Sequence, residues 1–271
     1  DGRWLAVSTA TGIYLHNAQD LNETPRWLET DSPVDNLIFS PDSALITAVS
    51  PQDGVHIWQV EDGRQMLAIP QKAEKVVFSP NGQFLAIIMP SYINEIQLWS
   101  LADSEKVTDF RESSAIAFSS SGALYAVVSN EDETMINIYQ LPDHELINAI
   151  EVNVASFMTS VNNMAFSKDE QSLILSKLSQ DGWNDSGSIE VRQIDTGDVV
   201  YTIPHLTSRI HRPFFCDSQF TSFEPLPYPV PVSIKVSPDG EQFTVIYEEE
   251  NTIGTTVVNY RLADGTLSHK F

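Results

Sequence analysis

A five-residue motif that recurs along the chain constrains its fold more than any other feature. The motif is Phe-Ser-Pro-Asp-Ser at residues 39–43, and it returns, with variation, at 78–82, 118–122, 166–170 and 236–240. The chain also opens inside the motif, with Asp1-Gly2 at its last two positions. The fourth motif position lies at residues 1, 42, 81, 121, 169 and 239, so the spacings are 41, 39, 40, 48 and 70. A base period of about 40 residues indicates a repeat architecture.

Within one period, apolar residues alternate with polar ones, and many are β-branched or aromatic, as in β-strands. In the second repeat this pattern predicts four strands, at residues 34–39, 44–49, 55–60 and 65–69. The later repeats copy the third strand as Ile96–Trp99, Ile136–Tyr139, Ile189–Arg192 and Val257–Tyr260, and the first repeat has Ile13–His16 there. Each unit is therefore predicted to be four antiparallel strands, and no segment has a helical pattern.

Apolar residues on both faces of such a sheet require a neighbouring sheet on each side. Copies arranged around an axis bury each sheet against the next, so the expected fold is an all-β β-propeller whose blades are four-stranded antiparallel sheets. We count six repeats over residues 1–271, treated as a single domain. The first repeat is incomplete, because residues 1–30 supply only the second to fourth strands.

The motif and the third strand together resemble the WD40-repeat family. The resemblance lies in Phe-Ser-Pro-Asp/Asn-Gly, followed by an apolar strand and then by Val-His-Ile-Trp at 55–58 or Ile-Gln-Leu-Trp at 96–99, and it covers essentially the whole chain. Two family features are missing. No repeat opens with Gly-His, and Gln59 and Ser100, rather than Asp, follow Trp58 and Trp99. A related propeller family with the same turn is the alternative.

The resemblance implies a ring of seven blades, which is the usual number in that family. Six repeats that begin inside a motif then lead us to expect that the sequence is a fragment of a larger protein, and that residues before Asp1 belong to the intact ring.

Composition restricts the partners. The chain has 37 acidic and 15 basic residues and a net charge of −22, which argues against nucleic acid and anionic membranes, because both need a basic surface. No apolar run reaches the length of a membrane-spanning helix, so membrane insertion is not expected. The single cysteine, Cys216, gives no indication of compartment.

The two longest spacings mark insertions in the fifth repeat. The first is read as a loop between the second and third strands, Ser179–Ser188. The second is a connection rich in proline and aromatic residues, 204–231, between the fifth and sixth repeats. Loops of this length are functional or disordered in most compact domains, and aromatic and arginine residues are enriched at binding hot spots. The alternative is that these aromatics only fasten the insertion to the propeller.

Acidic loops are expected on the same face as the insertion, where they would attract a basic partner. The candidate partner-binding residues therefore come from the insertion and these loops: Arg209, His211, Arg212, Phe214, Phe215, Phe220, Phe223, Tyr228, Trp183, Asp181, Asp185, Glu248, Glu249 and Glu250. The other interpretation of the acidic loops is that they only keep the chain soluble.

Motifs that carry chemistry are missing from the sequence. It has no phosphate-binding glycine loop, no paired Cys or His with metal-ligand spacing and no nucleophile elbow, so we predict no catalytic residue, no metal site and no cofactor. The expected function is a non-catalytic scaffold that recognises a protein or peptide, or other domains of the same polypeptide. The alternatives are a ligand-sensing regulatory domain for an attached effector and, less favoured, an enzyme that uses the central channel.

Overall fold

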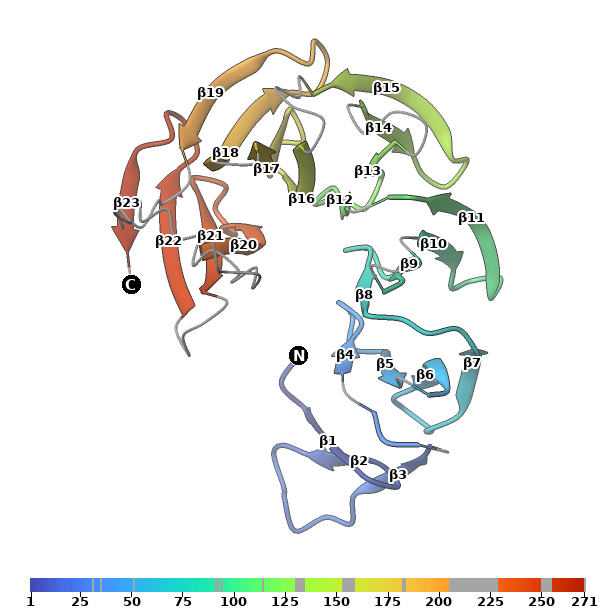
Figure 1. Cartoon of the computed structure of the whole chain (residues 1–271). Coiled ribbons are helices and arrows are strands. Elements are labelled where there is room, and N and C mark those ends of the chain that lie inside the picture. The colour runs from blue at the N-terminus through green and yellow to red at the C-terminus, as the bar shows by residue number, and fades with distance from the viewer. Residues whose placement is uncertain are drawn as a thin grey trace, which may run out of the picture. The chain divides into compact units, whose positions relative to one another are not determined.

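Every regular element in the described part of the chain is a β-strand (Figure 1). The computed structural model describes residues 1–30, 32–34, 36–50, 52–90, 93, 95–113, 115–129, 135–152, 159–181, 184–204, 229–249 and 255–270.

The strands form one three-stranded and five four-stranded sheets, and the strands of each sheet follow chain order. The first sheet contains β1 (Trp4–Thr9), β2 (Gly12–Asn17) and β3 (Arg26–Glu29). The second contains β4 (Asn36–Phe39), β5 (Leu45–Ser50), β6 (Gly54–Gln59) and β7 (Gln65–Ile69). The third contains β8 (Lys75–Phe78), β9 (Phe84–Ile88), β10 (Glu95–Ser100) and β11 (Glu105–Arg111).

The remaining sheets follow the same order. The fourth contains β12 (Ile116–Phe118), β13 (Leu124–Val128), β14 (Met135–Gln140) and β15 (Glu145–Glu151). The fifth contains β16 (Thr159–Phe166), β17 (Ser172–Asp181), β18 (Asn184–Gln193) and β19 (Val199–Pro204). The sixth contains β20 (Pro229–Val236), β21 (Gln242–Glu249), β22 (Thr255–Arg261) and β23 (Leu267–Lys270).

This arrangement confirms the prediction of repeated four-stranded antiparallel sheets with an incomplete first repeat. The chain divides into two compact units, one of residues 1–133 and 141–143 and the other of residues 134–140 and 144–271.

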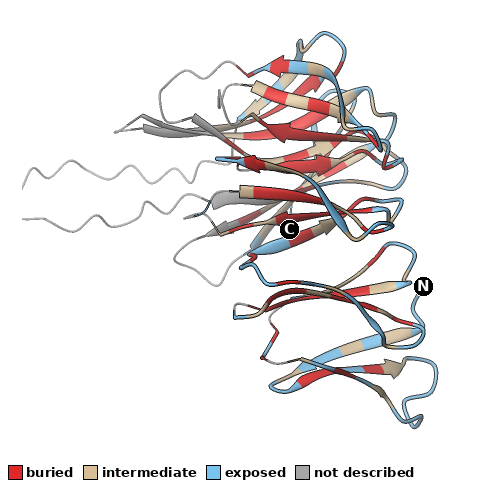
Figure 2. Ribbon diagram, turned by 90° about the vertical axis from the view of Figure 1, so that its right-hand side faces the viewer, coloured by how far each residue is buried: buried red, intermediate tan, exposed pale blue. Residues whose placement is uncertain are grey.

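Apolar side chains between consecutive sheets form the cores, and buried residues concentrate along the strands (Figure 2). In the first unit, one core joins the first sheet to the second through Ile13, Leu15, Ile46 and Trp58, among others. A second core joins the second sheet to the third. In the other unit, the fifth sheet packs on the sixth in the same way. The sheets in these three cores thus bury apolar residues on a neighbour, as the double-sided patterning predicts.

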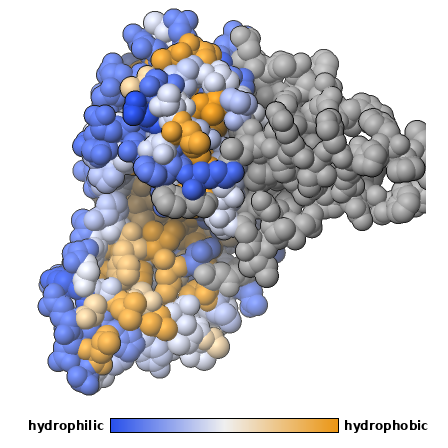
Figure 3. Space-filling view, turned by 90° about the vertical axis from the view of Figure 1, so that its left-hand side faces the viewer, coloured by the Kyte–Doolittle hydropathy of each residue, from blue (hydrophilic) through white to orange (hydrophobic). Residues whose placement is uncertain are grey.

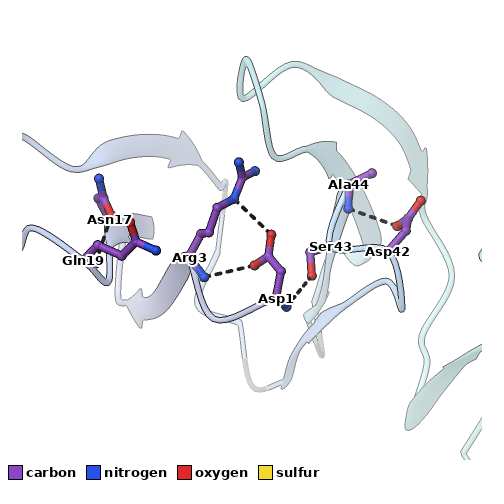
Figure 4. Close-up of polar contacts among 7 residues, drawn as sticks. All are labelled: Asp1, Arg3, Asn17, Gln19, Asp42, Ser43 and Ala44. Carbon is purple, nitrogen blue, oxygen red and sulfur yellow. Dashed lines mark hydrogen bonds and ion pairs between the residues drawn. The ribbon is translucent and has the colours of Figure 1, made fainter.

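The recurring motif forms the tight turn between the first two strands of each sheet. Its serine hydroxyl donates to the residue at the fourth motif position, as from Ser40 to Asp42 at 2.6 Å and from Ser79 to Asn81 at 2.7 Å. The same Asp42 oxygen accepts the backbone N–H of Ala44 at 3.0 Å (Figure 4). Asp1 accepts the N–H of Arg3 in the equivalent way. The motif is therefore conserved between repeats because its side chains bond to the turn itself.

A side chain on the fourth strand fastens several sheets to the next one. Arg26 Nη1 donates to the carbonyl oxygen of Val60, Asn148 Nδ2 to that of Ile194, and Tyr201 Oη to that of Leu262. The three donors occupy the same position in their sheets, opposite Leu15, Ile138 and Val191 on the third strand. That equivalence follows from the strand registers.

A β-bulge interrupts the pairing of the third and fourth strands in all five four-stranded sheets. Each bulge leaves one extra residue on the fourth strand, and these residues are Met66, Val107, Ile147, Val200 and Ser268.

A buried cluster of charges ties the fifth sheet to β15. Glu190 bonds to both Lys177 and Arg192, with the Arg192 Nη2–Glu190 Oε2 distance at 2.8 Å. Arg192 Nη1 also donates to the carbonyl oxygens of Glu151 and Gly197, both at 3.0 Å. The carboxylate and the carbonyls together compensate the burial of the guanidinium group.

Two sequence expectations about the fifth repeat need correction. The segment Ser179–Ser188 is mostly not a loop, because β17 continues to Asp181 and β18 begins at Asn184, so that Gln180 pairs with Asp185. The predicted insertion 204–231 is also shorter, because Pro204 ends β19 and Pro229 to Pro231 lie in β20. Strand pairing therefore extends into both segments.

Candidate interaction surface

The face of the first sheet that points away from the second sheet carries large exposed apolar side chains. They are Leu5 and Val7 on β1, Tyr14 on β2 and Trp27 on β3. The pairing places them together, because Val7 lies opposite Tyr14, and Tyr14 opposite Trp27. We call these four residues the open face. Figure 3 shows apolar surface in the lower part of the view, where the first sheet lies.

Equivalent positions in the other sheets are fully buried. Leu5 and Val7 lie four and six residues after the fourth position of the turn motif. The residues at the same two places in the other repeats are Ile46 and Ala48, Leu85 and Ile87, Tyr125 and Val127, Leu173 and Leu175, and Phe243 and Val245. Leu5 is 49% exposed and Val7 41% exposed, whereas both residues of each of the five other pairs are 0% exposed. The open face therefore has the composition of a sheet-to-sheet contact, and no described residue of the first unit covers it.

Aromatic rings form the centre of the open face. The Tyr14 and Trp27 rings are 4.6 Å apart at 55°, and the His16 ring lies 6.2 Å from Tyr14. Gly12 makes room for this cluster, because a Cβ there would come within 2.5 Å of the Trp27 ring. Tyrosine and tryptophan bury large areas at little entropic cost, which is why they dominate binding hot spots.

The carboxylates of the turn motifs are occupied in bonds to their own turns. The pKa of Asp42 lies below its usual value, first because of the hydrogen bond from Ser40 and then because of that from the Ala44 N–H. The pKa values of Asp169 and Asp239 are lowered in the same way by Ser167 and Ser237. Hydrogen bonds to a carboxylate favour its charged form. These turns are therefore anionic at neutral pH.

The site residues predicted from the sequence all fall where no side chain is described. Trp183, Glu250 and the eight candidates from the insertion lie outside the described residues. For Asp181, Asp185, Glu248 and Glu249 the backbone is described, and it lies in β17, β18 and β21. None of the fourteen side chains is described.

Sequence reasoning did not single out the open face, although a signal for it was present. The first repeat has Leu5 and Val7 at the positions that the other repeats use for core residues, and it adds Tyr14 and Trp27 beside them. A repeat that retains these apolar positions predicts a sheet face that packs against another surface.

Within the described ranges, no group of three or more His, Cys, Asp or Glu side chains could hold a metal ion. None of the described segments is a helix long and apolar enough to cross a membrane. Comparison with protein-family models and with curated protein sequences found no match for this chain.

Proposed function

We propose that this chain is a non-catalytic protein-interaction module built as a WD40-like β-propeller, and that the open face is one of its contact surfaces. The observation that carries the proposal is the exposure of Leu5 and Val7 at positions where five other sheets bury the equivalent residues completely. An exposed apolar cluster of this kind marks an interaction site in most soluble proteins.

The repeat geometry supports the propeller part of the proposal. Every complete sheet has the same strand order, the same serine-bonded turn and the same bulge. The first three sheets bury apolar residues on one another, and so do the fifth and sixth. Sheets that need a neighbour on both faces are the unit of a propeller. Rigid sheets also hold a binding surface in a fixed shape, which suits recognition.

The insertion and the acidic residues of the fifth and sixth repeats remain part of the proposal as a second contact region, with a basic protein or peptide as its partner. Their support is compositional: aromatic residues with arginine and histidine in the insertion, and carboxylates in a chain of net charge −22. Deletion of residues 205–228 tests this region, because it should remove binding of that partner while the thermal transition of the chain is retained.

Site-specific photo-crosslinking tests the open face. A benzoylphenylalanine placed at Val7 should crosslink to a second polypeptide in extracts of the source cells. Excess unlabelled wild-type chain should compete for that product. A competitor that carries Leu5→Asp and Val7→Asp should not, because two buried carboxylates would prevent apolar contact.

The matched control places the same crosslinker at Asn22, an exposed residue between β2 and β3. If Asn22 gives the same products as Val7, or if the double-Asp chain competes as well as the wild type, the open face is not a contact surface.

A further inference from the structure

The third turn motif contains an asparagine followed by a glycine, Asn81-Gly82, and the sequence has this dipeptide nowhere else. Gly82 has φ +70°, a conformation that favours glycine, and Gly2, Gly122 and Gly240 also have positive φ at this motif position. Asparagine before glycine is the dipeptide most open to attack on the side-chain amide by the next backbone nitrogen, because glycine has no side chain to hinder the approach. The turn therefore brings a reactive pair together.

Hydrogen bonds fold the Asn81 side chain over the peptide group that would attack it. Asn81 Oδ1 accepts the Ser79 hydroxyl at 2.7 Å and the Gln83 N–H at 3.1 Å. The second bond joins a side chain to the backbone two residues later, so it turns the amide carbon of Asn81 toward the Gly82 nitrogen. The Gly82 N–H donates to the Ser79 carbonyl oxygen at 2.8 Å, and this bond must open before the nitrogen can attack.

Asn17 lies in the same kind of turn but is followed by alanine. Its Oδ1 accepts the Gln19 N–H at 3.0 Å (Figure 4), and the Ala18 N–H donates to the Arg3 carbonyl oxygen at 2.8 Å. Both asparagines also donate a hydrogen bond from Nδ2, at 2.8 Å for Asn17 and at 3.1 Å for Asn81. Asn17 is therefore an internal control for the effect of the glycine.

Other repeats show that this turn accepts aspartate, the product of such an attack. Aspartate occupies the position of Asn81 in the second, fifth and sixth repeats, as Asp42, Asp169 and Asp239. Each of the three accepts the hydroxyl of its motif serine and the N–H of the residue two positions later, which are the bonds that Asn81 Oδ1 accepts. Aspartate at position 81 would thus keep the bonds of the turn.

The same change would remove a bond to the turn of the next repeat. Asn81 Nδ2 donates to the Gly122 carbonyl oxygen at 3.1 Å. The two turns are in close contact, because a Cβ at Gly122 would lie 2.6 Å from Asn81 Cγ. A carboxylate has no proton to donate at neutral pH, so it would place a negative charge beside that carbonyl oxygen.

We propose that Asn81 is a site of spontaneous deamidation in the folded chain, and that the turn retains the aspartate product. The Gly82 nitrogen loses its proton and bonds to Asn81 Cγ, and the Cγ–Nδ2 bond breaks to release ammonia. Water then opens the five-membered succinimide ring, which gives aspartate when it adds at Cγ and isoaspartate when it adds at the backbone carbonyl carbon. Water is the only co-reactant, and no group is oxidised or reduced. This proposal is independent of the proposed function.

Incubation of the folded chain in ¹⁸O-labelled water, followed by mass spectrometry of its peptides, measures the reaction. Deamidation leaves the label in the new carboxylate, and digestion at mildly acidic pH in ordinary water prevents labelling during the work-up. We expect the label to accumulate roughly tenfold faster at Asn81 than at Asn17. The rate at Asn81 should rise from neutral to alkaline pH, because the attacking nitrogen must lose its proton.

Two substitutions separate the reaction from its product. Asn81→Ser removes the side-chain amide, so the label should be absent from this peptide. The turn should still form, because the fourth repeat has Ser121 at this position, where it accepts the Ala123 N–H at 3.1 Å. Asn81→Asp has the product from the start, and it should fold with a thermal midpoint a few degrees lower, because the bond to Gly122 is lost.

The proposal is overturned if the label accumulates no faster at Asn81 than at Asn17, if its rate does not rise with pH, or if it appears only in chain unfolded with urea. Failure of Asn81→Asp to fold would also overturn it, because the turn would then not retain the product. An isoaspartyl methyltransferase detects the other product, and isoaspartate without any aspartate would contradict retention as well.

Discussion

The Tyr201 hydroxyl on β19 donates a 2.6 Å hydrogen bond to the carbonyl oxygen of Leu262, in the turn that follows β22. This bond links the fifth sheet to the sixth, and bonds from Arg26 and Asn148 occupy the same place between other sheets. Contacts between successive sheets therefore include a polar bond near the turns in addition to the apolar core.

Removal of the Tyr201 hydroxyl should weaken this link. We expect Tyr201→Phe to lower the free energy of unfolding by about 1 kcal/mol, because the Leu262 carbonyl loses its donor while the ring remains. Urea denaturation measures the difference. Tyr14→Phe is the matched control, and it should change stability by less than about 0.5 kcal/mol because Tyr14 lies on the exposed open face. Equal effects of the two substitutions would contradict this role of Tyr201.

Alkaline pH should weaken the same region. Burial, followed by the charge of Asp264, raises the pKa of Tyr201 to about 12 from an ordinary value of 10.0. Burial raises the pKa values of Tyr247 and Tyr260 as well. The unfolded chain then releases these protons at lower pH than the folded chain, so the stability they contribute is present below pH 10 and is lost as pH rises toward 12. Unfolding free energies measured across this range should fall less steeply for Tyr201→Phe than for the wild type.

A methyl group at Gly265 should disturb the contact with Tyr201. Gly265 has φ +69°, and a Cβ there would lie 2.6 Å from Cε2 of the Tyr201 ring. We expect Gly265→Ala to cost about 2 to 3 kcal/mol, of which the left-handed backbone accounts for about 1 to 2 kcal/mol. Gly2→Ala separates the two causes, because Gly2 has φ +74° with no atom within 4 Å of its Cβ position. Thermal unfolding should therefore show the smaller loss at Gly2.

Glu190 should be the most sensitive member of the buried charge cluster. Glu190→Ala leaves the buried Arg192 and the partly buried Lys177 without their shared carboxylate, so we expect a loss of about 3 to 5 kcal/mol. Glu145→Ala, at an exposed position at the start of β15, should leave the stability within about 0.5 kcal/mol of the wild type. A loss of less than about 1 kcal/mol at Glu190 would show that the cluster contributes little to stability.

Acid should destabilise the serine-bonded turns. Because Ser40 and the Ala44 N–H lower the pKa of Asp42, its carboxylate stabilises the fold above its ordinary pKa, and this contribution is lost as pH falls toward the lowered value. Asp42→Asn should reduce the loss of stability between about pH 5 and pH 3, measured by urea denaturation at each pH. The third repeat already holds Asn81 at this position, so the substitution fits the turn. An unchanged acid profile would mean that Asp42 is not a source of the pH dependence.

The sequence was sufficient to predict the strands and turns but not the contacts between sheets. The turn at Phe39 to Ser43 could be predicted because the bond from Ser40 to Asp42 lies within the motif itself. The links made by Arg26, Asn148 and Tyr201 could not be predicted, because three different residue types fill one structural position and leave no repeated letter. The hairpin at Asp181 and Asn184 was read as a loop, because its Asp, Asn, Ser and Gly residues are typical of turns, whereas pairing with the neighbouring strand extends it.

The bulges on the fourth strands bear on how this chain avoids polymerisation. A sheet edge with regular, unpaired N–H and C=O groups can recruit strands from any neighbouring molecule, and an extra residue breaks the spacing that such recruitment needs. Met66, Val107, Ile147, Val200 and Ser268 place this break on the outermost strand of all five four-stranded sheets. β1 pairs with β2 without any shift of register. The same holds for the first strands β4, β8 and β12 on their partners, so the break protects the fourth strands and not the first ones.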